Sequence, residues 1–250
     1  MRIELIDYQM PQVSLIITNY NYGKFLSRCI ESCLNQNYSD DFEVILVDDG
    51  STDDSLKIAY MYLKKGLRVI EQKNGGVESA SNNGFELANG KYVVRVDADD
   101  YLHPDYLKKV LSIFTPKISF VYSDYFIVDE NDDLYDEMNL PDFDTVEILS
   151  RGDFLATGTI YRKSDIESLG YYATKVRNCG LENYELIIKM LYNGNYGLHV
   201  KNKLFYYRRH KRNLSATKQN SIIAYGKDMF KRLGTSEYSI NKYHPYMNYE

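Results

Sequence analysis

Residues 13–34 read VSLIITNYNYGKFLSRCIESCL, and this stretch decides the fold class. The apolar run from Val13 to Thr18 is typical of a strand that is buried on both faces. Apolar residues then recur at positions 25, 26, 29, 30, 33 and 34, which is the spacing of one face of a helix. The stretch therefore predicts a strand followed directly by an amphipathic helix.

The same order of elements repeats in the residues that follow. Strands are expected at 43–47, 68–71 and 92–96, and helices between Ser51 and Leu63, over 77–88 and after Pro104. Such alternation predicts an α/β fold with a mostly parallel sheet flanked by helices. Further along we expect a long strand over 118–128, an acidic hairpin in DENDDLYDE (129–137), a helix after Glu182 and one or two strands over 196–207.

The composition and charge of the sequence argue against several classes of protein. A net charge of −5 over 250 residues argues against a nucleic-acid binder, which needs a basic face for phosphate. The sequence has no apolar run of about 18 residues, and its start, MRIELIDYQMPQ, lacks the basic-then-apolar order of a signal peptide. These features predict a cytoplasmic location. Cys29, Cys33 and Cys179 form no CxxC pair, so we expect neither a disulfide framework nor a zinc site. Cys29 and Cys33 fall on the apolar side of one predicted helix and are expected to be buried.

The end of the chain differs in charge from the rest. We expect one main domain over residues 1–210 and a helical, basic extension over 211–250 that packs on it or next to it. The extension carries Tyr225, Phe230 and Tyr243 among its lysines and arginines. This mixture suggests contact with an anionic membrane surface at the inner face, or with a second subunit in an oligomer, and a solvated helix is the alternative.

Polar side chains follow three of the predicted strands at their carboxyl ends. Thr18 and Tyr20 follow the first strand, Asp48 and Asp49 the second, and the DADD run from Asp97 to Asp100 the fourth. In an open parallel sheet, ligands bind where these ends converge. The sequence therefore predicts one site built from all three clusters.

The acidic run is the strongest of these clusters. Asp97 and Asp99 are two residues apart, so both carboxylates can turn toward one cation. Hard oxygen ligands of this kind suit Mg2+ or Mn2+, which can offset the charge that develops on a departing diphosphate. A solvated turn that caps a helix is the alternative for this run.

The second and first clusters suit a nucleotide. One of Asp48 and Asp49 is expected to cap the helix that follows, and the other to accept a hydrogen bond from a uracil-like base. Tyr20 offers a ring on which a base can stack. No GxxxxGK[ST] and no GxGxxG after the first strand are present, which removes the usual sequence support for nucleotide hydrolysis and for dinucleotide-dependent redox chemistry.

These residues resemble glycosyltransferase family 2 on a GT-A (Rossmann-like) fold. The resemblance spans Val13 to Ser215 and rests on several pieces in the order of the family. They are VSLIITNYNYGKFLSRCIESCLNQ, FEVILVDDGSTDDS, NGGVESASNNGFELANGKYVVRVDADDYLHPD, ATGTIYRKSDIESLGYY, LENYEL and YYRRHKRNLS. The resemblance implies an inverting, metal-dependent transfer of a sugar from a nucleotide-diphosphate donor, a UDP-sugar first of all, to an acceptor hydroxyl.

The resemblance also implies roles for individual residues. Those of the donor side hold the nucleotide and the cation. They are Thr18, Tyr20 and Asp49 for the nucleobase, with Asp48 as the alternative carboxylate, Asp97 for ribose or metal, Asp99 for the metal, and His210 with Arg208 beside it for the metal or the diphosphate. Ser81 stands where the family commonly has an arginine. The implied cofactor is Mn2+ or Mg2+.

Inverting members of the family use a carboxylate at the start of a late helix as general base. Glu182 occupies that position, and Glu185 is the next candidate, because Asn183 stands where the family usually has an aspartate and an amide takes no proton at neutral pH. The implied acceptor is a saccharide or lipid-linked saccharide, in the biosynthesis of a surface polysaccharide or glycan.

Asn183 and Ser81 motivate the alternative, a catalytically silent module that binds a nucleotide sugar. A sugar-phosphate nucleotidyltransferase is disfavoured, because TNYNYGK stands where that class needs a glycine-rich basic loop.

Overall fold

A computed structural model describes residues 11–151, 157–235 and 237–238. The first four strands pair in parallel in the order β3-β2-β1-β4. They are β1 (Val13–Asn19), β2 (Phe42–Asp48), β3 (Leu67–Glu71) and β4 (Tyr92–Asp97). This parallel half of the sheet is the one that the alternation of strands and helices predicts.

The sheet continues beyond β4 with strands of mixed direction. The order is β4-β8-β6-β9-β5, with β7 paired to the outer part of β6. These strands are β5 (Tyr101–Leu102), β6 (Ile118–Val128), β7 (Leu134–Met138), β8 (Ile160–Arg162) and β9 (Tyr196–Arg208). β8 runs antiparallel to both β4 and β6, whereas β6 and β9 are parallel. β8 therefore joins the parallel half to the rest of the sheet.

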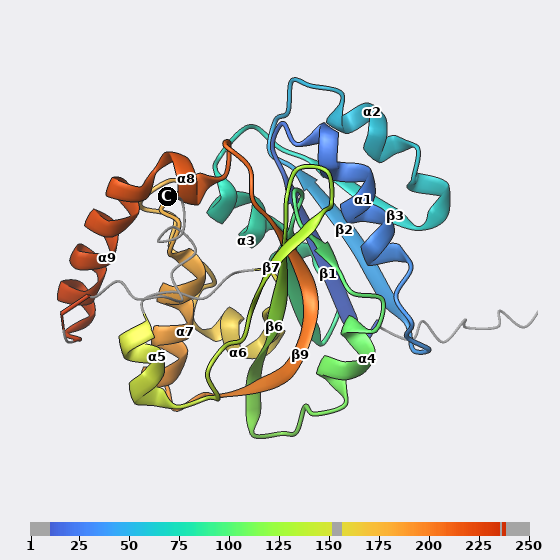
Figure 1. Cartoon of the computed structure of the whole chain (residues 1–250). Coiled ribbons are helices and arrows are strands. Elements are labelled where there is room, and N and C mark those ends of the chain that lie inside the picture. Colours follow the sequence, from blue (N-terminus) through green and yellow to red (C-terminus); the bar gives the residue numbers. More distant parts are fainter. Residues whose placement is uncertain (1–10, 152–156, 236, 239–250) are drawn as a thin grey trace, which may run out of the picture.

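Helices cover both faces of the sheet (Figure 1). Every residue of β1 is buried, because successive side chains point to opposite faces and both faces are covered. Leu15 and Ile17 pack in a core with α1 (Gly23–Leu34), α2 (Ser55–Tyr60) and α4 (Tyr106–Leu111). Ile16 packs in a second core with α3 (Val77–Leu87) and the later helices. These are α5 (Thr145–Arg151), α6 (Lys163–Ser168), α7 (Glu182–Tyr192) and α9 (Gln219–Leu233), and two short elements, η1 (Leu63–Lys65) and α8 (Leu214–Thr217), complete the chain order.

The expected α/β fold with a mostly parallel sheet flanked by helices is confirmed, and the antiparallel pairs all involve the short strands β5, β7 and β8. The strand over 118–128 and the hairpin after it lie where the pattern places them, and 196–208 forms one strand. The pattern gave no sign of β5, β8, α5 and α6, which are short elements of two to seven residues. Cys29 and Cys33 are buried, as expected, and Cys179 is buried as well.

The C-terminal extension differs from the expectation in one respect. Tyr225 and Phe230 do not face outward, because both are buried in the second core beside Ile222 and Met229 of the same helix. Tyr243 lies outside the described residues, as does the start of the chain. The division at residue 210 stays a prediction.

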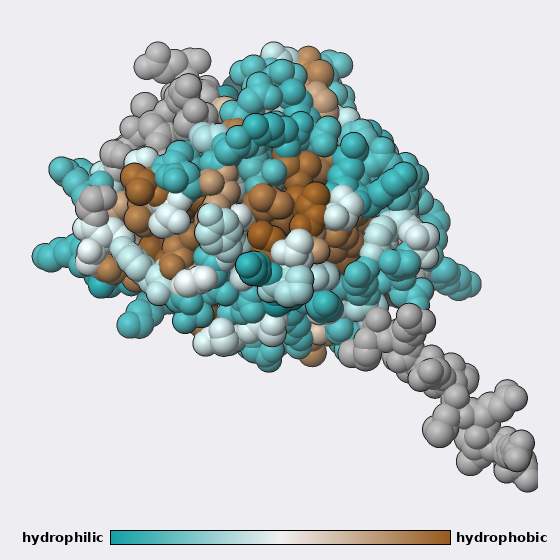
Figure 2. Space-filling model, turned by 90° about the horizontal axis from the view of Figure 1, so that it is seen from below, coloured by the Kyte–Doolittle hydropathy of each residue, from teal (hydrophilic) through white to brown (hydrophobic). Residues whose placement is uncertain are grey.

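Two surface properties bear on partners. Seen from below, hydrophobic residues gather in the middle of a mostly hydrophilic face (Figure 2). A patch of this kind is what a contact between subunits would use, and oligomerisation stays a prediction. Among the described residues, no helix combines the length and the apolar character that a membrane crossing requires.

Gly84 lies where α3 packs closely against the sheet. A Cβ added there would lie 2.3 Å from Cγ2 of Ile16 and 3.2 Å from Cγ2 of Val47. We expect Gly84→Ala to lower the free energy of unfolding by about 1–3 kcal/mol through overpacking. The loss should appear although Ala favours a helix over Gly by about 1 kcal/mol. Urea unfolding measures it, with the exposed Glu86→Ala as control on the same helix, and a stabilised Gly84→Ala would contradict the packing.

Candidate active site

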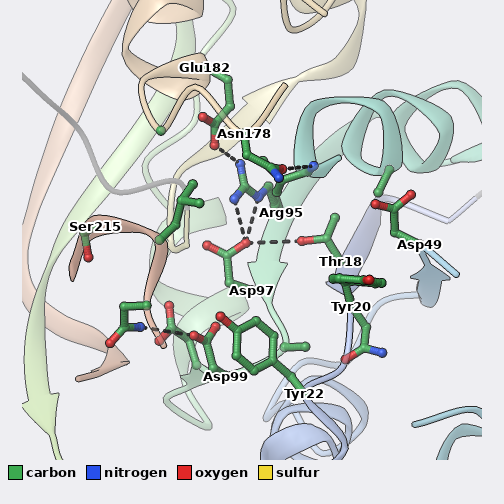
Figure 3. A pocket seen from close by; sticks show the side chains of 18 of the residues that line it. Thr18, Tyr20, Tyr22, Asp49, Arg95, Asp97, Asp99, Asn178, Glu182 and Ser215 are labelled. Carbon is green, nitrogen blue, oxygen red and sulfur yellow. Dashed lines mark hydrogen bonds and ion pairs between the residues drawn. The ribbon is translucent and has the colours of Figure 1, made fainter. Parts of the chain in front are cut away.

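A cavity of about 250 Å³ opens at the carboxyl ends of β1, β2 and β4 (Figure 3). The strand ends contribute Thr18, Tyr20, Asp49, Asp97 and Asp99. The facing wall comes from later parts of the chain and includes Asn178, Gly180, Glu182, Asn183, Asn213, Leu214, Ser215 and Ile222. The structure thus brings the three polar clusters to one cavity and adds a second wall to them.

Asp97 lies in the middle of this cavity and is held firmly on one side (Figure 3). Its Oδ1 accepts hydrogen bonds from Thr18 Oγ1 at 3.2 Å and from Arg95 Nε at 2.8 Å. Arg95 Nη2 also lies 2.7 Å from the same oxygen. Because these contacts all end on Oδ1, the carboxylate is oriented with Oδ2 left for a ligand.

Asp99 is paired with a histidine from the far end of the chain. His210 Nε2 lies 2.9 Å from Asp99 Oδ2, and Asn213 Nδ2 donates to the same oxygen at 3.2 Å. The imidazole is fixed by stacking on Phe25, with ring centroids 5.1 Å apart, and by the edge contact with Tyr22 at 5.5 Å. Two residues that are 111 positions apart in the sequence therefore meet beside the cavity, which Asp99 lines and His210 does not.

The chemistry of these side chains suits a divalent cation. Asp97 and Asp99 offer the carboxylate oxygens that Mn2+ and Mg2+ prefer. His210 offers a nitrogen, but its Nε2 lies 2.9 Å from Asp99 Oδ2, so it would have to give up that contact to bind the cation directly. The neighbouring Asp100 shows how much negative charge is concentrated here. Burial and then the charges of Asp99 and Asp97 raise the pKa of the Asp100 carboxyl. A cation at Asp99 would offset this repulsion.

Asp48 and Asp49 have different surroundings. Asp48 accepts hydrogen bonds from Asn19 Nδ2 at 2.7 Å and from the backbone N–H of Ser51 at 2.8 Å, so it orders the turn after β2. It does not line the cavity. Asp49 does, but its two oxygens already accept bonds from Gln72 Nε2 and from the backbone N–H groups of Gly75 and Gly76, at 2.7–2.8 Å. Asp49 therefore orders the loop that forms this side of the cavity.

Tyr20 is exposed at the edge of the cavity, whereas Arg208 is buried outside it. The Tyr20 ring is 47% exposed at the edge of the cavity, where a flat ligand can stack on it. Arg208 is 2% exposed and does not line the cavity. Its guanidinium donates to the backbone oxygens of Asp99 and Asp129 at 2.8 and 2.9 Å. Arg208 therefore supports the backbone of Asp99. It does not reach the cavity, so it cannot contact a nucleotide bound there.

Glu182 faces Asp97 across the cavity from the first turn of α7 (Figure 3). Its Oε1 accepts a hydrogen bond from Arg95 Nη1 at 2.5 Å, and its Oε2 lies 3.7 Å from Cys179 Sγ. Glu185, the other candidate base, is turned away and binds Lys189 Nζ at 2.8 Å and the hydroxyl of Tyr225. Of the two predicted carboxylates, the structure brings only Glu182 to the cavity.

Asn183 is built into the protein interior. It is 2% exposed, and its Oδ1 accepts hydrogen bonds from the hydroxyls of Tyr172, at 3.1 Å, and Tyr161. Its amide thus joins α7 to the segment before it and to β8. The asparagine at this position serves packing and hydrogen bonding in the fold.

Arg95 was missed by the sequence reasoning, although a signal was present. An arginine inside the strand YVVRVD interrupts an otherwise apolar run, and burial of a charge normally requires a partner. Among the described residues that line the cavity, Arg95 supplies the positive charge. Ser81, where the resemblance leads one to expect an arginine, instead donates its hydroxyl to the backbone oxygen of Val77 at 2.6 Å.

Glu78 holds the start of α7 in place from the first turn of α3. Its two oxygens accept hydrogen bonds from the backbone N–H groups of Asn178 and Cys179, at 2.9 and 2.7 Å. Asn178 Oδ1 in turn accepts the N–H of Val77 at 3.0 Å. Burial and then the charge of Glu182 raise the pKa of the Glu78 carboxyl. The side chains of Glu78, Cys179 and Glu182 also lie close enough together to bind one metal ion. Both oxygens of Glu78, however, already accept hydrogen bonds from backbone N–H groups.

A comparison with protein families matches residues 14–177 to the family described as "Glycosyl transferase family 2". Among curated relatives, the chain is 43% identical over 113 residues to a chondroitin synthase from Escherichia coli, a match that covers 44% of this chain and 16% of that protein. It is 47% identical over 95 residues to the uncharacterized glycosyltransferase EpsJ of Bacillus subtilis, covering 37% of this chain and 27% of EpsJ. The chain spans well under half the length of these relatives.

Solved structures share the fold. The S. aureus protein TarS, in complex with UDP-GlcNAc, superimposes with a TM-score of 0.70 at 20% identity and covers 88% of this chain and 66% of that one. The mannosyltransferase PcManGT from Pyrobaculum calidifontis, in complex with GDP-Man and Mn2+, gives a TM-score of 0.71 at 19% identity, with 93% and 67% covered. Both likenesses support the GT-A architecture of the chain.

The buried Glu78 predicts a pH dependence of stability. Because its pKa is raised above the ordinary 4.5, the folded protein holds this proton more tightly than the unfolded chain, so ionisation costs stability as the pH rises from about 4.5 toward the raised value. Glu78→Gln, which stays neutral, should lose stability overall but gain relative to the wild type across that pH range. Urea unfolding at several pH values measures the difference, with the exposed Glu86→Gln as control. A pH-independent difference for Glu78→Gln would contradict the prediction.

Proposed function

The chain belongs to glycosyl transferase family 2, and from that premise we propose that it transfers a sugar from a UDP-sugar to an acceptor hydroxyl with inversion. The observation that carries the proposal is the pair of carboxylate groups facing one another across a single cavity. Asp97 and Asp99 lie on the strand side, and Glu182 lies on the helix side. A donor bound between them has its leaving group on one side and room for an acceptor on the other.

The strand side suits the nucleotide. The exposed ring of Tyr20 offers a stacking surface for the base, and Thr18 and Asp97 Oδ2 lie where ribose hydroxyls can bind. Asp49 and, at the turn, Asp48 hold the loops that frame this subsite. TarS, which shares the fold, has been solved with UDP and with UDP-GlcNAc, which supports a uridine nucleotide here.

The diphosphate would lie beside Asp99. Mn2+ or Mg2+ held by Asp99, Asp97 and His210 would supply charge neutralisation for the departing diphosphate. Asn213 and the backbone support from Arg208 keep Asp99 in its orientation. The Mn2+ complex of PcManGT supports this choice of cofactor.

Glu182 is the proposed general base. Its Oε1 is bound to Arg95 at 2.5 Å, so Oε2, which accepts only the long hydrogen bond of the Cys179 thiol, is the atom that would take the proton of the acceptor hydroxyl. The acceptor oxygen then forms its bond to the anomeric carbon while the bond to the diphosphate oxygen breaks on the opposite face. Glu182 lies at the amino end of α7, where the helix dipole stabilises its negative charge.

The relatives suggest the kind of acceptor. Chondroitin synthase of Escherichia coli and hyaluronan synthase of Pasteurella multocida are among the similar proteins, which supports a saccharide or lipid-linked saccharide acceptor in polysaccharide biosynthesis. A peripheral contact of the basic extension with an anionic membrane remains part of this proposal. Because Ile222, Tyr225, Met229 and Phe230 of α9 are buried, a contact made by this helix would rely on its charged residues.

One observation favours the second candidate, a module that binds a nucleotide sugar without turnover. Glu182 is engaged by Arg95, and Asn183, buried beneath it, cannot accept a proton. Donor binding with no product across a broad acceptor panel would support this candidate.

Asp99→Asn tests the cation side. We expect donor-dependent transfer in the presence of Mn2+ to fall by about 100-fold or more, because the amide is a poor cation ligand and the leaving charge is then less stabilised. Release of UDP from a panel of UDP-sugars measures the rate, and calorimetric titration with Mn2+ and UDP measures binding. Full turnover in Asp99→Asn would refute the metal role.

Glu182→Gln tests the base. We expect kcat to fall by about 100- to 10,000-fold, since the amide accepts no proton, while the affinity for donor stays within a few-fold. Glu185→Gln is the matched control on the same helix, and its transfer rate should stay close to that of the wild type because Glu185 does not line the cavity. A larger loss in Glu185→Gln than in Glu182→Gln would reassign the base.

A further inference from the structure

Arg95 is buried at a position where a charge is costly. Its side chain is 5% exposed, and its strand neighbours Val94 and Val96 belong to the first core, so Arg95 points to the opposite face of the sheet. A guanidinium at this depth is stable only when it is paired and hydrogen-bonded. The groups that bind Arg95 therefore indicate the role of this buried charge.

The guanidinium spans the two sides of the cavity. Nε and Nη2 lie 2.8 and 2.7 Å from Asp97 Oδ1, and Nη1 donates to Glu182 Oε1 at 2.5 Å (Figure 3). The ring of Tyr172 lies 5.9 Å from the guanidinium carbon. One rigid, planar group thus fixes one oxygen of each carboxylate, while the other oxygen of Glu182 accepts a hydrogen bond from the Cys179 thiol at 3.7 Å.

The charge of Arg95 is maintained by these partners. Burial disfavours its charged form, but the neighbouring Asp97 and Glu182 hold the pKa of the guanidinium above its ordinary value. Glu78 adds a further buried carboxylate beside Glu182. Without Arg95, these three acidic groups would face one another with no cation among them.

We propose that Arg95 is a positioning residue that aligns the donor-binding Asp97 and the base Glu182 with each other. This inference rests on the proposed function, because it assigns Arg95 to the same transfer reaction. Arg95 acts through the two carboxylates and does not itself take part in the bonds that form and break. Its removal should therefore lower the rate of the chemical step more than the affinity for donor.

The experiment compares Arg95→Met and Arg95→Lys with the wild type in the full chain. Expected for Arg95→Met is a loss in kcat of about 100-fold, the size of effect that follows from misplacing reacting groups, with the Kd of UDP in Mn2+ changed less than about threefold. Arg95→Lys keeps the charge but not the planar fork, and it should recover only part of the rate. Free guanidinium should restore part of the rate of Arg95→Met.

The double variant separates positioning from general support of the fold. If Arg95 acts through Glu182, then adding Arg95→Met to Glu182→Gln should cost much less than about 100-fold. Arg162→Met is the matched control, because Arg162 also inserts into the sheet and binds backbone oxygens, but lies outside the cavity. It should lower thermal stability without a selective loss in kcat.

The outcomes distinguish this inference from the proposed function. A wild type with no turnover in the donor and acceptor panel would reject the proposed function. With an active wild type, a tenfold or greater rise in the Kd of UDP at unchanged kcat would show that Arg95 holds the donor directly and overturn the positioning role. Fully additive losses in the double variant, or no rescue by guanidinium combined with a folding defect, would overturn it as well.

Discussion

The register between three parallel strands is the constraint on which the site depends. β1 pairs on one side with β2 and on the other with β4, so that Asn19 lies beside Asp48 and Thr18 beside Asp97. The polar residues at the three strand ends thereby reach the same level of the sheet. A shift of one residue in either pairing would turn these side chains to the opposite face. Leu15 and Ile17 of β1 pack in one core and Ile16 packs in the other, so the packing that fixes the fold also fixes this register and the site.

Charge compensation is the second requirement, and it explains why the two walls of the cavity belong together. Buried carboxylates are stable when they are paired or hydrogen-bonded, and the buried carboxylates around this cavity have such partners. Asp97 and Glu182 share Arg95, Glu78 binds the backbone that leads into α7, and Asp99 binds His210 and Asn213. The ionic groups thus fix the position of α7 relative to the sheet, a task for which apolar packing alone gives less directional control.

Much of this arrangement was predictable from the sequence, because hydrophobic periodicity reports on strands and helices and the ends of parallel strands converge by geometry. The cluster of Thr18, Tyr20, Asp49, Asp97 and Asp99 followed from that reasoning. The hydrogen-bond partners of individual side chains did not follow from it. Arg208 and Glu185 were assigned to the site from the resemblance, but Arg208 turns to the backbone oxygens of Asp99 and Asp129, and Glu185 turns to Tyr225 and Lys189. Short elements such as α5 and β8 carry too few residues to show a period.

The two walls also differ in where they lie along the chain. The match to the family ends at residue 177, whereas the wall opposite the strand ends begins at Asn178 and runs on to Ile222. The wall at the strand ends is thus encoded in one contiguous stretch, and the facing wall in another. The contacts of Glu78 with the backbone of Asn178, and of Asp99 with Asn213, cross between the two stretches. Any change in the second stretch must therefore preserve these contacts if the two walls are to keep their relative position.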